Sequence, residues 1–210
     1  MKEGDFSKPF SDLIAQISQF STATVYEAMG QTGAIHSSIK PLNKKMKLCG
    51  PAITVEGKPG DNLALHKVIY LAQPGDIMVV SVGGYDEAGY WGEIMTAAAK
   101  ARKLGGLVLD GGIRDSEILE DLQFPIFCKN VCIKGTAKLY PGKFGEPLNF
   151  MGTIIHPGDI VLGDGDGLVV IRRNMLEEVI KLSLERTQKE SNILRMLESK
   201  STLEIYNLGE

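Results

Sequence analysis

Residues 91–127 read WGEIMTAAAKARKLGGLVLDGGIRDSEILEDLQFPIF and contain the alternation of helix and strand signals that decides the predicted fold. Residues 93–103 are strong helix formers with four alanines, and a pair of glycines ends that run. The apolar stretch 106–110 is typical of a short buried strand. A second glycine pair precedes a predicted helix over 116–122 and a strand over 124–127. This alternation predicts an α/β layer with a partly parallel sheet.

The segment before this stretch adds two short helices and a strand. Apolar residues at helical spacing within 7–30 predict two helices, the second capped by Ser21 or Thr22. Residues 46–56, MKLCGPAITVE, predict a strand. We expect that strand to be interrupted at Gly50–Pro51, because proline removes a backbone donor.

One short sequence pattern occurs twice in the chain. QPGDIMVVSVGG begins at Gln73, directly after a predicted helix over 61–72, and HPGDIVLGDGDG begins at His156. In both copies Pro-Gly predicts a turn, and an apolar strand follows the aspartate. The pattern indicates two related strand entries, and it is too short to indicate a duplication.

The C-terminal part of the chain changes character. Residues 131–173 are rich in glycine and short apolar runs, which predicts a β-rich segment. Their GDGDG run, 163–167, lacks the glutamate of a calcium loop, so we expect a turn into a strand over 168–172. Residues 174–199 predict a long, charged helix with one apolar stripe, which we expect to reach a neighbouring subunit.

Length and composition restrict the class of protein. The 210 residues, of which 43% are hydrophobic, suit one domain over 1–210 with a packed core. A formal net charge of -3 argues against nucleic acid as a partner. The start of the chain lacks the apolar region of a signal peptide, and no apolar run approaches the roughly 20 residues of a membrane span. Three cysteines, Cys49, Cys128 and Cys132, predict reduced thiols in the cytoplasm, away from any membrane.

The first candidate site follows the predicted strand 106–110. Ligands of open α/β sheets bind beyond the carboxyl ends of strands, where Arg114 and Asp115 lie. Arginine presents a planar fork suited to a carboxylate, and aspartate is a hard oxygen ligand suited to Mg²⁺ or Mn²⁺. The alternative is a surface Arg-Asp pair in which the aspartate only caps the next helix. Local sequence by itself favours this alternative, since such pairs are common at helix starts.

The second candidate site is the start of the alanine-rich helix at Gly92. The first N–H groups of that helix lack intrahelical partners and suit a carboxylate. The alternative is a glycine loop that only turns the chain, which is the commoner use of glycine. The three histidines show no ligand spacing, and no nucleotide or pyridoxal phosphate motif predicts an organic cofactor. We expect Lys100 to be solvated rather than to form a Schiff base.

Taken together, these stretches resemble the 4-hydroxy-4-methyl-2-oxoglutarate aldolase family, also called the RraA-like family after its regulators of ribonuclease E. The most specific match is GYWGEIMTAAAKARKLGGLVLDGGIRD, and 22 positions separate Gly92 from Arg114, as the family pattern requires. Further matches are STATVYEAMG, CGPAITVE, GDNLALHKVI, PGDIMVV, FPIF and HPGDIVLGDGDGLVVI. The resemblance implies a swivelling β/β/α-type α/β domain with a long C-terminal helix, assembled as trimers or hexamers.

The resemblance also implies substrate-binding residues. The backbone amides of the loop that begins the helix hold a pyruvate-like 2-oxo acid, and Arg114 binds the same substrate. The residues of that loop are Gly92, Glu93, Ile94 and Met95.

The implied cofactor is a divalent metal cation, Mg²⁺ or Mn²⁺. Asp115 matches the metal ligand, and Glu93 matches an acidic residue that contacts the metal through water. The RTQKE stretch ending at Glu190 resembles one that supplies an acidic residue to a neighbouring subunit's site. One departure concerns the residue three positions after the metal aspartate, which is often acidic in the family. Here it is Ile118, and the acid is Glu117.

The activity implied by the resemblance is that of a class II aldolase. It cleaves 4-hydroxy-4-methyl-2-oxoglutarate or a related 4-hydroxy-2-oxo acid to pyruvate, and it also decarboxylates oxaloacetate. Arg114, Asp115 and Glu93 are the expected catalytic residues. The alternative from the same family is a non-catalytic protein that binds and regulates a ribonuclease.

Overall fold

The computed structural model describes residues 10–206 and is organised around a curled sheet of eight strands. The strand order is β1-β7-β5-β3-β2-β12-β13, and β9 pairs with β2. The central strands β7, β5, β3 and β2 are parallel, whereas β1, β9, β12 and β13 pair antiparallel with their neighbours. The bounds are β1 Lys40–Pro41, β2 Leu48–Glu56, β3 Ile77–Ser81, β5 Gly106–Leu109, β7 Ile126–Cys128, β9 Lys143–Phe144, β12 Ile160–Gly163 and β13 Leu168–Ile171.

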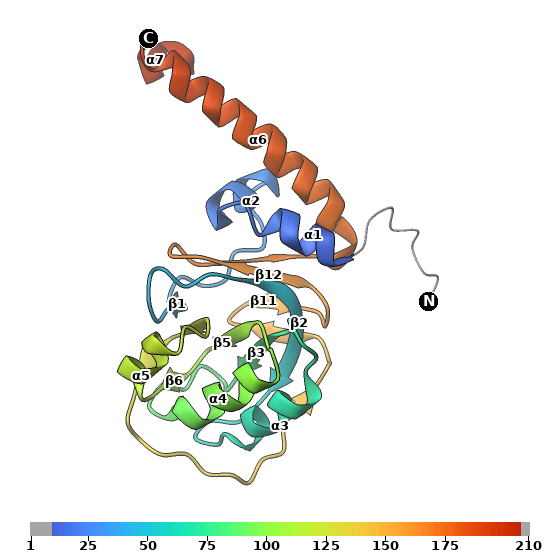
Figure 1. Ribbon diagram of the computed structural model, residues 1–210, viewed down its shortest axis with the longest axis vertical. Coiled ribbons are helices and arrows are strands. Elements are labelled where there is room, and N and C mark those ends of the chain that lie inside the picture. Colours follow the sequence, from blue (N-terminus) through green and yellow to red (C-terminus); the bar gives the residue numbers. More distant parts are fainter. Residues whose placement is uncertain (1–9, 207–210) are drawn as a thin grey trace.

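Three helices cover the parallel part of the sheet on one side (Figure 1). They are α3 Leu63–Leu71, α4 Glu93–Ala101 and α5 Ser116–Asp121. The core beneath them is apolar and includes the fully buried rings of Tyr90 and Trp91. Trp91 stacks on Phe124 with ring centroids 6.3 Å apart. The predicted α/β layer with a partly parallel sheet is therefore confirmed.

A second group of helices packs at the other end of the molecule, against β12 and β13 (Figure 1). They are α1 Phe10–Ile17, α2 Thr22–Ala28 and the 21-residue α6 Leu176–Met196, which follows the 3-10 turn η1 Arg173–Met175 and precedes α7 Thr202–Ile205. Buried residues of α6 all lie in its first half, and the rest extends away from the body. The predicted long C-terminal helix is confirmed. No helix within residues 10–206 is both long and apolar enough to cross a membrane.

Two small sheets complete the fold. A hairpin joins β10 Leu148–Phe150 to β11 Thr153–Ile155. The strands β4 Gly89–Trp91, β6 Gly112–Ile113 and β8 Asn130–Val131 form a parallel three-stranded sheet. This second sheet matters for the site, because β4 leads directly into α4 and β6 leads directly into α5.

The predicted interruption of the strand 46–56 is wrong, since β2 runs continuously through Gly50 and Pro51. Ala52 donates its N–H to Asp159 O at 2.7 Å. Because hydrogen-bonded and non-hydrogen-bonded pairs alternate along antiparallel strands, the preceding pair, Pro51 with Ile160 of β12, is one that needs no hydrogen bond. Pairing with β3 begins only at Ala52, opposite Ile77. The missing donor of proline therefore leaves both ladders intact.

Other local predictions agree with the structure. Ser21, one of two predicted caps, accepts the N–H of Thr24; residues 7–9 of the first predicted helix lie outside the described residues. The two Pro-Gly-Asp turns are alike: the side chains of Asp76 and Asp159 accept the N–H of Gln73 and His156 at 2.8 and 2.9 Å. The GDGDG run is the turn between β12 and β13.

Gly50 is expected to be essential for stability. A Cβ at this position would lie 2.5 Å from the carbonyl oxygen of Gly75, a backbone atom that cannot move aside cheaply. Gly50→Ala should lower the free energy of unfolding by about 2 kcal/mol, a typical overpacking cost. Gly135→Ala is the control, since no atom lies within 4 Å of its Cβ position. Equal urea midpoints for the two variants would contradict the assigned packing.

Candidate active site

Two loops meet where the parallel strands β4 and β6 end. Because the strands are neighbours, their carboxyl ends lie side by side, and the N–H of Arg114 donates to Trp91 O at 2.8 Å. Gly92 follows Trp91 and begins α4, while Asp115 follows Arg114 and begins α5. The topology therefore brings the two candidate sites from the sequence together into one.

The conformation of Asp115 is unusual for a residue at a helix start. Its backbone is left-handed, with φ 60° and ψ 35°, a region that non-glycine residues seldom occupy. Its side chain makes no capping hydrogen bond to α5. Instead, Oδ2 accepts the N–H of Glu93, the first residue of α4, at 3.1 Å. The alternative that Asp115 only caps its own helix therefore does not hold.

Gly92 permits this approach. A Cβ on Gly92 would lie 2.4 Å from Asp115 Oδ2 and 3.2 Å from Arg114 Cγ. The glycine is thus required by the close contact between the two loops rather than by a turn, since its backbone is extended. The alternative of a loop glycine that only turns the chain does not hold either.

The six residues predicted for the substrate and metal line a single cleft of about 410 Å³. They are Gly92, Glu93, Ile94, Met95, Arg114 and Asp115. Arg114 is half exposed, and its Nε lies 3.8 Å from Asp115 Oδ2. Within residues 10–206 its guanidinium makes no hydrogen bond, so its fork remains available to an anionic ligand.

Three other residues considered from the sequence do not line this cleft. Glu117 lies outside it, and the exposed apolar side chain of Ile118 lines the wall instead. Glu190 lies on α6, where it pairs with Arg186 at 2.9 Å. Lys100 lies outside the cleft and donates to Leu122 O. Ile118, three residues after Asp115, therefore lines the cleft, and Glu117 does not take its place.

The sequence interpretation missed part of the cleft. Asn62 and His66, four residues apart along α3, line it together with Thr136 and Lys138 from the long loop after β8. Burial and the nearby Lys138 lower the pKa of His66, which keeps its imidazole neutral at pH 7. The i, i+4 spacing of Asn62 and His66 was a signal that they share a face. Thr136 and Lys138 had no such signal.

Two buried aspartates hold the loops around the cleft. Asp61 accepts the N–H groups of Leu63, Leu139 and Tyr140, and thereby ties the loop bearing Lys138 to α3. Although burial opposes it, these hydrogen bonds lower the pKa of Asp61. The carboxylate therefore stays ionised and keeps its three hydrogen bonds from backbone N–H groups.

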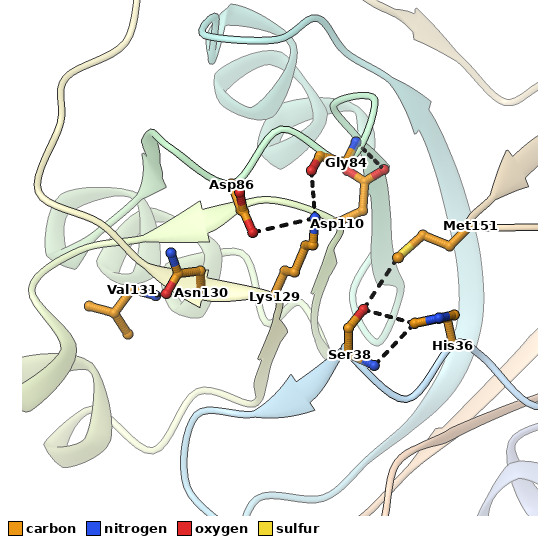
Figure 2. A network of polar contacts seen from close by, with 9 residues as sticks. All are labelled: His36, Ser38, Gly84, Asp86, Asp110, Lys129, Asn130, Val131 and Met151. Carbon is orange, nitrogen blue, oxygen red and sulfur yellow. Dashed lines mark hydrogen bonds and ion pairs between the residues drawn. The ribbon is translucent and has the colours of Figure 1, made fainter.

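The second buried aspartate, Asp110, fixes the loop that leads from β3 to β4. It accepts the N–H of Val82 at 2.5 Å and of Gly84 at 3.0 Å. Burial raises the pKa of Asp110, and the hydrogen bonds and Lys129 oppose that rise. Figure 2 shows Lys129 between Gly84 and Asp86, donating to Gly84 O at 2.8 Å. Asp110 lies directly before the 111–115 loop, and its hydrogen bonds to Val82 and Gly84 also hold the loop between β3 and β4.

The side chains that could act as metal ligands indicate which cation the cleft suits. Within residues 10–206 no group of three or more His, Cys, Asp or Glu side chains is arranged to hold a metal ion. Zinc is usually held by several His or Cys ligands, of which the described residues lining this cleft offer only His66. Mg²⁺ is commonly held by one or two carboxylates and keeps several waters. Asp115 Oδ1, which accepts no hydrogen bond from the described residues, and the exposed Glu93 fit such a hydrated cation.

These features define a mixed α/β protein with an Arg-Asp cleft at the ends of two parallel strands. The profile of the RraA-like family, Aldolase/RraA, matches residues 22–170, which include every residue of the cleft. The chain belongs to the RraA-like family.

Relatives and solved structures agree with this assignment. A protein of Halalkalibacterium halodurans named "Putative 4-hydroxy-4-methyl-2-oxoglutarate aldolase" is 36% identical over 170 residues, 81% of this chain and 81% of that protein. An uncharacterised protein of Pseudomonas syringae is 28% identical with a TM-score of 0.83, covering 97% of this chain and 99% of that one. Streptomyces coelicolor RraAS2, described as an unusual member of the RNase ES inhibitor RraA protein family, is 28% identical with a TM-score of 0.79, covering 91% and 99%.

Two glycines of the site are expected to respond differently to alanine. A Cβ at Gly112 would lie 2.6 Å from Ala88 O and 2.8 Å from Asp86 O, both backbone atoms, so Gly112→Ala should lower Tm by several degrees. A Cβ at Gly92 meets the end of the Asp115 side chain, which can rotate away. Gly92→Ala should therefore keep Tm within about 2 °C of the parent. A large loss of Tm in Gly92→Ala would show that the Asp115 contact stabilises the fold.

Proposed function

We propose that this chain is a divalent-metal-dependent aldolase that cleaves 4-hydroxy-4-methyl-2-oxoglutarate or a related 4-hydroxy-2-oxo acid to pyruvate, and that it also decarboxylates oxaloacetate. The observation that carries the proposal is the placement of the Asp115 carboxylate over the N-terminus of α4, beside the Arg114 guanidinium, whose Nε lies 3.8 Å from Asp115 Oδ2. The left-handed backbone of Asp115 is what directs its carboxylate to α4 instead of to its own helix.

Arg114 and the start of α4 supply the substrate-binding contacts in this proposal. The guanidinium binds the carboxylate of the 2-oxo acid. The backbone amides of residues 92–95, apart from that of Glu93, which donates to Asp115 Oδ2, bind the same end of the molecule. These donors are fixed before the substrate arrives, because β4, β6 and the buried aspartates hold both loops. Donors that need no rearrangement stabilise developing negative charge most effectively.

Both reactions pass through the same intermediate, the negatively charged enolate of pyruvate. In aldol cleavage the C4 hydroxyl loses its proton, the C3–C4 bond breaks, and its electron pair forms the enolate of pyruvate. In decarboxylation the same bond breaks and carbon dioxide leaves. Protonation at C3 then gives pyruvate in each case. Arg114 lies where it stabilises the enolate, so one site serves both reactions.

Asp115 would hold the cation directly and Glu93 would contact it through water. When bound, Mg²⁺ or Mn²⁺ supplies Lewis-acid stabilisation of negative charge on the 2-oxo group. The cleft holds a second basic side chain, Lys138, besides Arg114. Two cations favour a substrate with a second carboxylate, and 4-hydroxy-4-methyl-2-oxoglutarate has one. The aldolase name of the Halalkalibacterium relative supports the same reaction.

The second candidate function is regulation of a ribonuclease by binding. The description of the Streptomyces relative as a member of an RNase ES inhibitor family favours it. Binding to a protein would not require Asp115 to adopt a left-handed conformation over α4, so the geometry favours the enzyme. Metal-dependent release of pyruvate, compared with inhibition of ribonuclease turnover by the same preparation, separates the two functions.

We expect separate effects from the two central residues. Asp115→Asn keeps the side-chain shape but removes the charge that holds the cation, so it should weaken metal affinity, and excess Mn²⁺ should partly restore turnover. Arg114→Lys loses the planar fork and should lower kcat/KM on the order of 10²-fold with metal affinity intact. The measurement is steady-state decarboxylation of oxaloacetate with a metal titration and a melting curve for each variant.

The parent protein provides the control for this experiment. Its activity toward oxaloacetate and a panel of branched and plain 4-hydroxy-2-oxo acids should disappear with EDTA and return with Mg²⁺ or Mn²⁺. Near-parental turnover in both folded variants would place the chemistry elsewhere in the molecule. Full activity after removal of all divalent metal would contradict the proposed cofactor.

We also propose that residues 1–210 act as one domain in a homotrimer or hexamer in the cytoplasm, with Glu190 reaching a neighbour's cleft. Three apolar side chains near the cleft support the assembly: Ile94, Ile133 and Leu139 are 81%, 90% and 84% exposed. Such exposure is costly in water unless another surface covers it. The three cysteines, all free thiols, support a reducing compartment.

Light scattering should therefore show a particle three or six times the 22.8 kDa mass of the chain. Ile133→Asp, which places a charge in the exposed apolar surface, should shift the population toward smaller species while leaving the melting curve of the monomer fold intact. A parent protein that is monomeric at working concentration would overturn the assembly and the role of Glu190.

A further inference from the structure

Asn62 stands out among the residues of the cleft because half of its side-chain amide has no partner. It lies at the start of α3 and is only 6% exposed. Its Nδ2 donates to Tyr90 O at 2.9 Å and contacts Met95 Sδ at 3.7 Å. Its Oδ1 is buried and accepts no hydrogen bond within the described residues.

The orientation of this amide follows from its neighbours. Turning it over would place Oδ1 against the carbonyl oxygen of Tyr90, so that two acceptors would face each other. The NH₂ group of the amide is therefore bonded to Tyr90 O, and the carbonyl oxygen, Oδ1, is the atom without a partner. His66, Thr136 and Lys138 line the same cleft, yet none of them donates to Asn62 Oδ1.

A buried acceptor without a partner costs free energy, which a ligand with a suitable donor recovers. The other groups at the proposed substrate end, Arg114 and the α4 amides, are donors and match carboxylate and 2-oxo oxygens. Asn62 Oδ1 needs the opposite kind of group. In an ionised 4-hydroxy-2-oxo acid the carboxylates and the 2-oxo group are acceptors only, and the C4 hydroxyl alone can donate.

We propose that Asn62 is a specificity-determining residue whose Oδ1 accepts a hydrogen bond from the C4 hydroxyl of a 4-hydroxy-2-oxo acid. This inference rests on the function proposed above. An amide carbonyl is too weak a base to remove the proton, so the contact recognises and orients the hydroxyl and leaves its deprotonation to another group.

The proposal separates the two reactions of the site. Oxaloacetate has a carboxylate where the aldol substrate has its hydroxyl, and so offers Asn62 Oδ1 no donor. Loss of the acceptor should therefore affect the aldol substrate alone. A residue that only supported Tyr90 and the cleft wall would affect both substrates together.

The test compares Asn62→Ala and Asn62→Asp with the parent in both reactions, under saturating Mg²⁺. Asn62→Ala should raise KM for 4-hydroxy-4-methyl-2-oxoglutarate by on the order of 10-fold or more, the usual loss for one buried hydrogen bond, and leave KM for oxaloacetate within about twofold. Asn62→Asp keeps an acceptor oxygen but places a second one against Tyr90 O and adds a charge that repels the anionic substrates, so it should raise KM for both of them, in contrast with Asn62→Ala. Asn43→Ala, an asparagine outside this cleft that contacts Glu120, is the matched control and should change neither KM.

Each outcome decides the proposal. Equal changes of KM in both reactions for Asn62→Ala would assign Asn62 a structural role and overturn the inference. A parent protein that decarboxylates oxaloacetate but cleaves no hydroxy acid would also overturn the inference about Asn62, but it would leave the proposed decarboxylation intact. A parent protein without either metal-dependent activity would remove the proposed function itself.

Discussion

The contact between the Asp115 carboxylate and the first N–H of α4 is the constraint on which the site depends. It requires β4 and β6 to be parallel neighbours, because only then do their carboxyl ends lie side by side. It also requires a residue without a side chain at Gly92 and a left-handed backbone at Asp115. Each of these features is costly or restrictive by itself, and together they place the Asp115 carboxylate, a helix N-terminus and the Arg114 fork in one cleft.

Glycine-rich loops are poor supports for a site unless something holds them, and here buried carboxylates do so. Asp110 accepts two backbone N–H groups and the hydroxyl of Ser81 on one side of the cleft. Asp61 accepts three backbone N–H groups and ties down the loop that carries Lys138. Charge-assisted bonds to several donors outweigh the cost of burying the Asp61 carboxylate and reduce that cost for Asp110. Asn62 is different, because its buried acceptor has no partner within the described residues, and this is the observation behind the substrate contact proposed for it.

Much of the fold followed from local signals, and the exceptions have identifiable causes. The helices α4 and α5 and the strand β5 agreed with the sequence because helix formers, apolar runs and glycine pairs all indicated the same elements. The strand through Pro51 did not, because the effect of a missing N–H depends on which neighbour that N–H would face. The strands β4, β6 and β8 are only two or three residues long, too short for any periodic signal.

The sequence by itself determined the alternation of helices and strands, the long charged helix at the C-terminus and the identity of the residues on the two loops that form the cleft. Those are properties of short windows, in which propensity and spacing act directly. Only the tertiary structure decided that Asp115 turns away from its own helix toward α4, and that Asn62 and Lys138 face the same cleft. These arrangements depend on contacts between residues 22 to 78 positions apart. No local pattern records which groups the pairing of β4 with β6 and the hydrogen bonds to Asp61 will bring together.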